Sequence, residues 1–328
     1  MNLSTTYMGL ELKNPFIVGS SRITGDLKAI RQCVAAGASA IVLKSLFEEQ
    51  IRLEAESHLR KARGGDVYYW YPEAKEHVVG LSVEANLENY LGFVNELKKE
   101  SDIPIIASIN CVTPEGWPKF ASAIQEAGAD ALELNIAIFP FDNSQSSAEI
   151  EKRYVDILKE VKKQITIPVS IKLGYYFTNL CSVAHKLVDA GADGLVLFNR
   201  YFRPDIDINT MGVVADDYIS SPEETNIPLR WIALMTGNNL DCDLVASTGV
   251  HTHEQVIKQI LVGARAVQLC STLYKNGNHY IRNIEEGLNK WMEEHRFNSL
   301  DDFRGKSLDK QATDVSFERV QFMKRNYE

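Results

Sequence analysis

The sequence predicts a (β/α)8 TIM barrel, eight parallel strands that each precede a helix, with long insertions after the second and sixth strands. One pattern, a helix that ends at glycine followed by a short apolar run, occurs four times in the 328-residue chain: AAGASAIVLKS (35–45), EAGADALELNI (126–136), DAGADGLVLFN (189–199) and LVGARAVQLCS (261–271). The intervals between these copies each have room for two βα units of about 30 residues. Strand-like and helix-like patterns also alternate strictly along the chain, as a barrel requires.

The eight strands follow from short apolar runs. The runs after the four repeated glycines are rich in Val, Leu and Ile and too short for helices, which is typical of buried strands. Glycine suits the end of the preceding helix because it adopts the left-handed conformation at little cost. Four more strands lie between the repeats: NPFIVG (14–19), IPIIAS (103–108), IPVSIK (167–172) and DLVAS (243–247). Helical patterns predict helices over 26–36, 86–100, 116–127, 147–164, 178–190, 222–236, 252–262 and 279–295.

A long doubly wound sheet is the alternative arrangement of eight alternating units. The chain lacks the dinucleotide-binding pattern GxGxxG and the phosphate-loop pattern GxxxxGK[ST]. The even spacing and the repeat favour the closed barrel. We therefore expect residues 1–328 to form a single domain, interrupted by insertions at 46–85 and 200–228.

Composition and charge exclude several classes of protein. The formal net charge of -9 disfavours a nucleic-acid binder, which usually carries a basic surplus. No apolar run approaches the roughly 18 residues of a membrane span, and the first residues have no signal-peptide pattern. The five cysteines form no CxxC pair, so disulfides, zinc and iron–sulfur clusters are not expected, and a cytoplasmic location fits. Without an NAD-binding domain, an electron acceptor beyond a bound cofactor would be a small molecule or another chain.

Polar side chains follow the predicted strands at their carboxyl ends, where barrels carry their active sites. In strand order they are Gly19, Ser20 and Ser21; Lys44 and Ser45; Ser108 and Asn110; Glu133 and Asn135; Ser170 and Lys172; Asn199 and Arg200; Ser247, Thr248 and Gly249; and Cys270, Ser271 and Thr272. The alternation along a strand places residues two apart on one face. We expect a polar ring at one mouth of the barrel, the alternative being strand ends that turn polar only where water begins.

The ends of the last two strands favour phosphate binding. Small residues with free backbone N–H groups stand at 247–249 and 270–272, where barrels often bind phosphate. His251 and His253 lie nearby, but no carboxylate or cysteine stands at metal-ligand spacing, so no metal is expected.

The two insertions carry separate expectations. Residues 46–85 contain an amphipathic helix and the aromatic run Tyr68–Tyr71, which predicts a subunit contact, and hence a homodimer, or a lid over the mouth. Residues 200–228 could cover the site or form a small hairpin.

Several of these segments resemble the dihydroorotate dehydrogenase family of FMN-dependent barrels. They are NPFIVGSSRIT at the start, VLKS with Lys44, ELN with Asn135, IKL with Lys172, FN with Asn199, and SLDDFRGK near the end. The resemblance covers almost the whole chain in order. LFEEQIRLE (46–54) and LVLFNRYFRPDID (195–207) look closest to a divergent branch of dihydroorotate dehydrogenase-like proteins.

The resemblance implies an oxidoreductase of pyrimidine biosynthesis that passes hydride between a dihydropyrimidine-like small molecule and FMN. The catalytic positions that it implies are Lys44, Asn135 and Asn199, and the FMN-binding positions are Gly19, Ser20, Lys44, Ser45, Asn110, Asn135, Lys172, Thr248, Gly249, Cys270 and Ser271. A lysine beside the flavin is chemically sensible because its charge stabilises the reduced ring.

The sequence departs from the family pattern at the position of the general base. Family members carry a cysteine or serine there, and this chain has Ile138, which cannot accept a proton. Loss of a general base typically costs a factor of about 10² to 10⁴ in rate. Four other residues are of a type that could supply the base instead: Ser144, Tyr175, Tyr176 and Cys111. Thr248 and Cys270 also stand at usual glycine sites of the phosphate end.

Two other functions compete with the dehydrogenase hypothesis. Ile138 would fit a flavin-binding barrel with a different substrate or no catalysis. Lys44 and Lys172 at strand ends would fit a lyase that forms a Schiff base.

Overall fold

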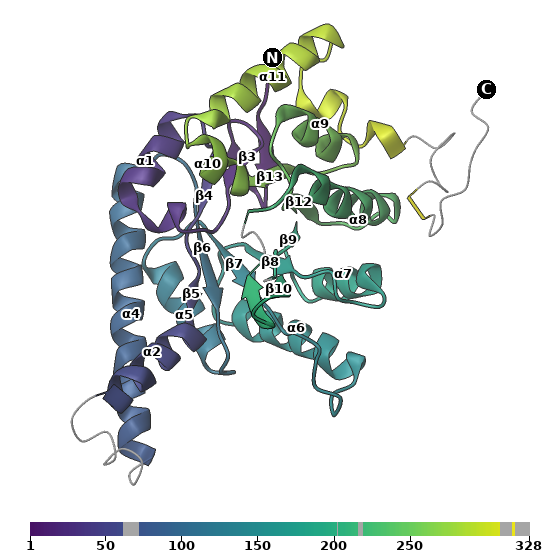
Figure 1. The fold of residues 1–328 in the computed structure, drawn as a ribbon. Helices are drawn as coiled ribbons and strands as arrows, with labels where there is room; N and C mark the ends of the chain where they lie inside the picture. The colour runs from purple at the N-terminus through teal and green to yellow at the C-terminus, as the bar shows by residue number, and fades with distance from the viewer. Residues whose placement is uncertain (62–71, 202, 216–218, 309–316, 319–328) are drawn as a thin grey trace.

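Eight parallel strands close into a barrel, as the sequence predicts (Figure 1). The computed structural model describes the whole chain except residues 62–71, 202, 216–218, 309–316 and 319–328. The barrel strands are β3 (Phe16–Val18), β4 (Ala40–Val42), β6 (Ile105–Asn110), β7 (Ala131–Asn135), β8 (Val169–Leu173), β9 (Gly194–Leu197), β12 (Asp243–Ser247) and β13 (Ala266–Leu269). Each pairs in parallel with its neighbours, and the β13–β3 and β4–β6 pairings close the ring.

Helices surround the barrel and begin and end at recognisable signals. They are α1 (Leu27–Ala35), α4 (Pro72–Glu100), α5 (Gly116–Glu126), α6 (Ser147–Lys162), α7 (Leu180–Asp189), α8 (Asn226–Gly237), α9 (His253–Leu261), α10 (Ser271–Asn276) and α11 (Tyr280–Glu294), with 3-10 turns η1 (Ile23–Gly25), η2 (Pro222–Thr225), η3 (Leu300–Asp302) and η4 (Lys306–Leu308). Asp26 caps α1, and Ser146 with Glu149 forms a capping box on α6. The repeated glycines take positive φ just after their helices, as at Gly128 and Gly191. No helix in the described ranges is both long and apolar enough to cross a membrane.

The insertion after β4 is more helical than the sequence analysis predicts. After β5 (Leu46–Phe47), which extends the sheet beside β6, helix α2 (Glu48–Lys61) packs on the 29-residue helix α4. The expected boundary at residue 86 is wrong, because α4 begins at Pro72, a residue type that suits the first position of a helix. The aromatic run Tyr68–Tyr71, which predicted a homodimer contact or a lid, lies outside the described residues.

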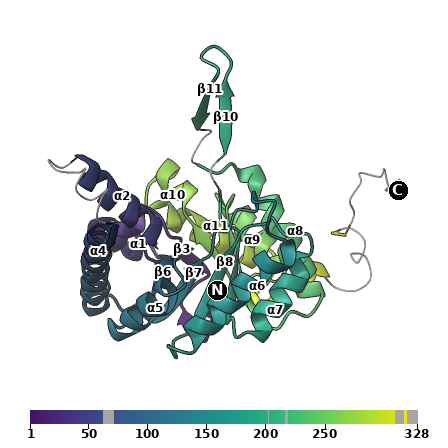
Figure 2. The ribbon, with the colours of Figure 1, turned by 90° about the horizontal axis from the view of Figure 1, so that it is seen from below.

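The insertion after β9 forms a hairpin and then returns to the barrel. Strands β10 (Pro204–Asp207) and β11 (Gly212–Ala215) pair antiparallel, with Ile206 opposite Val213, and the hairpin projects from the barrel (Figure 2). The segment that follows leads through η2 into α8. The hairpin alternative of the sequence analysis therefore describes the first half of this insertion.

The amino-terminal end of the barrel is sealed. The hairpin of β1 (Thr5–Tyr7) and β2 (Leu10–Leu12) carries Tyr7 against β9, so closely that a Cβ on Gly194 would lie 2.8 Å from the Tyr7 ring. Tyr7, Met8 and Leu12 form one buried cluster with inward-facing strand residues such as Ile106. Among the described residues these side chains fill this end of the barrel, so the opposite mouth is the candidate site.

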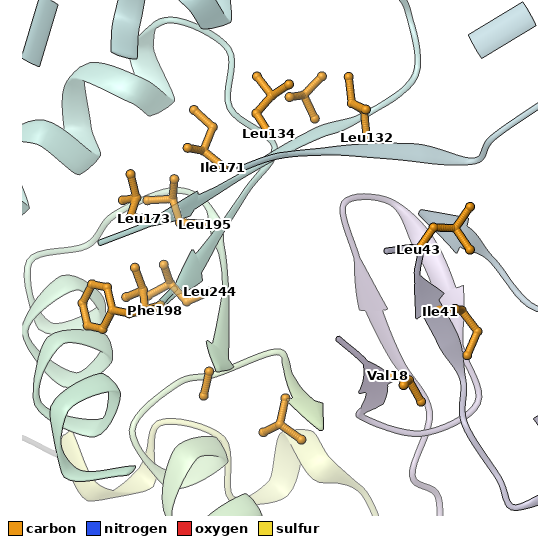
Figure 3. Packing of buried hydrophobic residues seen from close by; sticks show 14 of the residues in the cluster. Val18, Ile41, Leu43, Leu132, Leu134, Ile171, Leu173, Leu195, Phe198 and Leu244 are labelled. Carbon is orange, nitrogen blue, oxygen red and sulfur yellow. The ribbon is translucent and has the colours of Figure 1, made fainter. Parts of the chain in front are cut away.

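Alternate residues of the strands face the helices. Leu132 and Leu134 on β7 and Ile171 and Leu173 on β8 join the large apolar cluster outside the barrel wall (Figure 3). The residues between them face the barrel interior.

The repeated motif also has a side-chain role at the start of the strands. Asp130, two residues after Gly128, accepts hydrogen bonds from Ile105 N at 2.7 Å and from Lys98 Nζ at 2.7 Å. Asp193 repeats the arrangement with Val169 N and Lys162 Nζ, both at 2.8 Å. Each carboxylate thus ties the beginning of one strand to its neighbour and to a helix.

We predict that Asp130→Ala lowers the free energy of unfolding by about 1 to 3 kcal/mol, because it leaves the Ile105 N–H and the Lys98 ammonium without their partner. Urea unfolding followed by circular dichroism measures the change. Asp156→Ala is the matched control, since Asp156 forms only an exposed pair with Lys152. That control should change stability by less than about 0.5 kcal/mol. Equal losses in the two variants would contradict the strand-tying role.

Candidate active site

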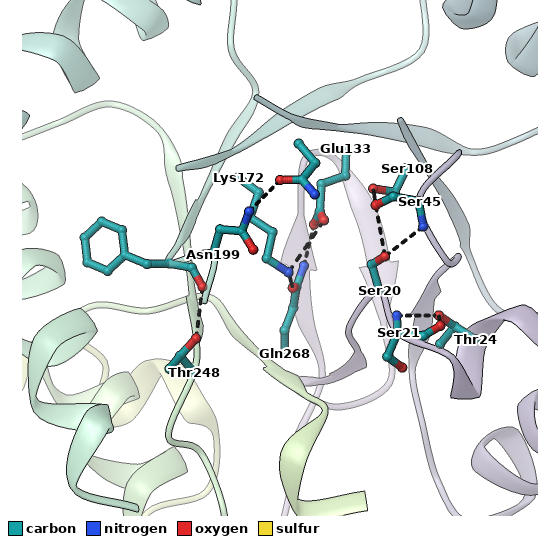
Figure 4. Close-up of polar contacts among 12 residues, drawn as sticks. Ser20, Ser21, Thr24, Ser45, Ser108, Glu133, Lys172, Asn199, Thr248 and Gln268 are labelled. Carbon is teal, nitrogen blue, oxygen red and sulfur yellow. Dashed lines mark hydrogen bonds and ion pairs between the residues drawn. The ribbon is translucent and has the colours of Figure 1, made fainter. Parts of the chain in front are cut away.

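A buried charge cluster crosses the barrel interior at the level of the predicted polar ring. Lys172 Nζ on β8 donates to Gln268 Oε1 on β13 at 2.8 Å, and Gln268 Nε2 donates to Glu133 Oε2 on β7 at 2.5 Å (Figure 4). Lys172 Nζ lies 3.8 Å from Glu133 Oε1, and the three residues are at most 7% exposed. Within the described residues, Gln268 is the one hydrogen-bond acceptor of the Lys172 ammonium, which leaves N–H donors for a ligand.

Three asparagines form an amide network beside this cluster. Asn199 Nδ2 donates to Asn135 Oδ1 at 2.8 Å, and Asn110 Nδ2 donates to the Asn135 carbonyl at 2.8 Å. The network joins the ends of three strand units and fixes the orientation of the Asn135 amide. An amide has both donors and acceptors, so the outer atoms of this network suit a ligand that presents ring N–H and C=O groups.

Hydroxyl groups connect the ends of the first three strand units. Ser20 Oγ lies 3.1 Å from Ser45 Oγ, which lies 2.7 Å from Ser108 Oγ. Tyr90 on α4 clamps the backbone of Ser108, accepting from its N–H at 2.9 Å and donating to its C=O at 3.2 Å. Burial raises the pKa of the Tyr90 phenol well above its ordinary value, so this hydroxyl keeps its proton.

Lys44 stands apart from this cluster. Its side chain is exposed, and its stem runs past η1, where a Cβ on Gly25 would lie 3.1 Å from Lys44 Cδ. The next residue, Ser45, is buried and belongs to the hydroxyl chain.

The loops after β12 and β13, at residues 247–249 and 270–272, form a backbone cradle. The loop after β12 is strained. Thr248 and Gly249 both have φ of 78°, which is unusual for a β-branched residue such as threonine. The Thr248 hydroxyl donates to the Phe198 carbonyl at 3.1 Å and holds this conformation. Gly249 is required for space as well, because a Cβ there would lie 2.2 Å from Thr225 N. This cradle lies at the strand ends for which the sequence predicts phosphate binding.

Ser220 links the two loops of the cradle. Its hydroxyl accepts from Gly249 N at 3.2 Å, and its N–H donates to Ser271 Oγ at 3.0 Å. His251 Nε2 lies 3.3 Å from Ser220 Oγ. Burial lowers the pKa of His251, which favours the neutral imidazole at neutral pH. The second half of the 200–228 insertion therefore forms part of the site.

An open cleft lies above these groups, with about 660 Å³ of empty space that is continuous with solvent. Its lining includes eight of the positions expected from the sequence: Gly19, Ser20, Lys172, Asn199, Thr248, Gly249, Cys270 and Ser271. Three further expected positions lie outside this lining. Ser45 bonds Ser20, and Asn110 lines an adjoining groove. Asn135 is buried and bonds both Asn110 and Asn199. Sequence reasoning missed Gln268 and Ser220. Gln268 had a signal, a polar residue inside the apolar run AVQL, whereas Ser220 had none.

Aromatic rings line the mouth beside the cleft. Tyr175 and Tyr176 have ring centroids 4.7 Å apart, and Tyr201 and Phe139 extend the group at 5.4 and 5.6 Å from Tyr176. The Tyr201 ring packs against the backbone of Gly174, where a Cβ would lie 2.4 Å from the ring. The cluster gives this part of the mouth an apolar, aromatic wall.

The four substitute bases differ in how they are placed. Cys111 is buried, and burial raises the pKa of its thiol well above the ordinary value, so it remains protonated. Ser144 is exposed and donates to Asp142 at 2.7 Å. Tyr175 and Tyr176 lie at the mouth, and the hydrogen bond with Tyr175 raises the pKa of Tyr176. The structure thus places neither the thiol nor the serine in a setting that suits a base.

Comparisons with known proteins agree on one family. The family model described as dihydroorotate dehydrogenase matches residues 80–292. The chain is 27% identical over 318 residues to the catalytic subunit of dihydroorotate dehydrogenase B (NAD(+)) from Thermoplasma volcanium, covering 94% of this chain and 99% of that protein. It is 28% identical over 307 residues to a protein named putative dihydroorotate dehydrogenase A (fumarate) from Aeropyrum pernix, covering 92% and 96%. It is 24% identical over 335 residues to the chloroplastic dihydropyrimidine dehydrogenase (NADP(+)) of Arabidopsis thaliana, covering 94% and 77%.

We predict that Lys172→Met lowers the free energy of unfolding by about 3 to 5 kcal/mol, because it leaves the buried Glu133 carboxylate without a cation. Adding Glu133→Gln to this variant removes the unpaired charge and should restore part of the loss. Urea unfolding of the two single variants and the double variant measures the coupling. Simple additivity of the single losses would contradict a coupled buried pair.

Proposed function

The chain belongs to the dihydroorotate dehydrogenase family, and from that membership we propose that it is an FMN-dependent oxidoreductase acting on a carbon–carbon bond of a dihydropyrimidine-like ring. The observation that carries the proposal is the buried Lys172 ammonium, which lines an open cleft and retains N–H donors for a ligand. Family membership makes an oxidoreductase the functional class, and the site supports FMN as its cofactor.

The residues of the cleft fit FMN at both of its ends. At the phosphate end, the positive φ of Thr248 and Gly249 turns the backbone between two strand ends, and Ser271 begins helix α10. At the ring end, an ammonium group is suited to the electron-rich pyrimidine edge of a flavin, where it stabilises negative charge. Lys172, Thr248, Gly249 and Ser271 are therefore assigned to the cofactor, together with the lining residues Gly19, Ser20 and Cys270.

The substrate is assigned to the amide network. FMN supplies hydride acceptance when bound, and the protein must orient the ring that donates or receives the hydride. Asn135 and Asn199 fix each other at 2.8 Å and offer donors and acceptors for the N–H and C=O groups of a dihydropyrimidine. We assign Lys44 to the same rim because it follows the end of β4. Its side chain is exposed, so its flexible stem must turn inward to reach the substrate.

For the proton half of the reaction, the position where the family carries its base holds Ile138, and among the described residues neither Cys111 nor Ser144 is placed to replace that base. Oxidation of a CH–CH bond removes a hydride from one carbon and a proton from the other, and Ile138 cannot take that proton. This observation favours a second candidate function: a flavin-binding barrel of the family whose substrate differs from dihydroorotate or whose catalysis is lost. Burial of Cys111 and the bond of Ser144 to Asp142 support the same alternative.

The flavin content of the purified chain and the reduction of that flavin test the proposal directly. The purified full chain should contain close to one FMN per chain, and anaerobic dihydroorotate or dihydrouracil should bleach the flavin absorbance. Fumarate and NAD⁺ then serve as acceptors for reoxidation, since the names of the relatives specify different acceptors. Bound FMN without bleaching by any dihydropyrimidine would favour the second candidate, and failure to bind flavin would overturn both.

We predict that Ile138→Cys raises the rate of flavin reduction by dihydroorotate by at least about tenfold, because a general base contributes a factor of about 10² to 10⁴ when well placed. Stopped-flow absorbance under anaerobic conditions measures this rate. Ile138→Ala is the matched control, since it opens the same space without adding a base, and its rate should stay near that of the unaltered chain. Equal rates in the two variants would contradict the assignment of the missing base to position 138.

A further inference from the structure

Two arginines share one buried carboxylate beside the cleft. Arg203 donates to Glu224 Oε2 at 2.8 Å, and Arg200 Nε donates to the same oxygen at 3.2 Å. The Glu224 side chain is 9% exposed, and it also accepts from Ser221 N at 2.9 Å. Two guanidinium groups on one carboxylate leave an excess positive charge. None of the functions assigned above uses this charge.

One of the two guanidinium groups lines the cleft. Arg200 lines the cleft together with Ser220, Gly249 and Ser271, whereas Arg203 lines only the smaller pocket next to it. Glu224 itself is built into the cradle, because a Cβ on Gly249 would lie 2.7 Å from the Glu224 carbonyl carbon. Glu224 therefore contacts the loop at Gly249 through its backbone and Arg200 through its carboxylate, and Arg200 and that loop line the same cleft.

One backbone donor of the cradle is already in use. Gly249 N, which would serve a phosphate, donates to Ser220 Oγ, whereas Ser271 Oγ accepts from Ser220 N and keeps its own O–H for a ligand. A guanidinium has five N–H donors, of which Arg200 directs Nε and Nη2 to Glu224. Its remaining donors and its charge are suited to a phosphate dianion.

We propose that Arg200 binds the phosphate group of FMN and that Glu224 is the positioning residue that holds its guanidinium. This inference rests on the proposed function and adds a cationic phosphate ligand to it. The charge distinguishes FMN from riboflavin, because riboflavin has the same ring system and no phosphate.

Binding of both flavins to three forms of the chain tests the proposal. The flavin-free full chain, Arg200→Gln and the matched control Arg203→Gln are titrated with FMN and with riboflavin, and quenching of flavin fluorescence gives each dissociation constant. Arg200→Gln should weaken FMN binding by about tenfold to a hundredfold, the usual range for a charge-assisted hydrogen bond. It should change riboflavin binding by less than about twofold. Arg203→Gln should have little effect on either, and Arg200→Lys, which retains the charge, should lie between.

Each other outcome overturns the proposal in a distinguishable way. Equal weakening of FMN and riboflavin binding would show a structural role for Arg200. Unchanged FMN binding with a raised KM for an acidic substrate would assign the charge to a substrate carboxylate. If the unaltered chain binds neither flavin, the proposed function fails as well, whereas unchanged FMN binding in Arg200→Gln removes only this inference.

Discussion

The site depends on one constraint, the burial of a lysine and a glutamate inside a closed barrel. Burying two charges is expensive, and it is tolerated when geometry and additional hydrogen bonds compensate. Here the register of β7 and β8 places Asn135 beside Lys172 and Glu133 beside Ser170, and Gln268 from the far side of the barrel connects the two charges. Below this layer the barrel is sealed by apolar packing around Tyr7. Above it the strands end, so the ammonium faces the one mouth where a ligand can enter.

The rim of the barrel divides into two parts that different segments support. At the phosphate end, the return of the 200–228 insertion supplies Ser220 and Glu224, and both contact or bond the loop at Gly249. At the opposite end, the amide pair of Asn135 and Asn199 stands beside an aromatic wall. The same insertion that projects as a hairpin therefore completes the site with its second half. A segment that the sequence marks only as long and irregular determines how the phosphate end is closed.

The barrel could be predicted because the sequence patterns of its strands and helices are local. The remaining features could not be predicted, since they depend on contacts between residues distant in sequence. The repeated glycines and the alternation in ELN and SIK predict the strands and their inward faces. Helix α4 begins earlier than expected because Pro72, which reads as a loop residue in isolation, suits the first position of a helix. Gln268 was visible as a polar residue in an apolar run, but its partners lie 96 and 135 residues away. Ser220 sits in an insertion with no period, and the exposed course of Lys44 depends on how η1 packs.

Oxidation of a CH–CH bond has two halves, transfer of a hydride and removal of a proton. Ile138 bears on the second half only. In the proposed function, Lys172 supports a flavin electrostatically and the asparagines orient a ring, and hydrogen bonds hold both sets of side chains. Proton removal depends on one side chain in the loop after β7, and that loop instead presents Ile138 and Phe139 beside tyrosines. An apolar wall lowers the local dielectric, which strengthens charge interactions nearby and disfavours an unpaired base. The surroundings of Ile138 therefore favour the second candidate function, in which the substrate differs from dihydroorotate or catalysis is lost.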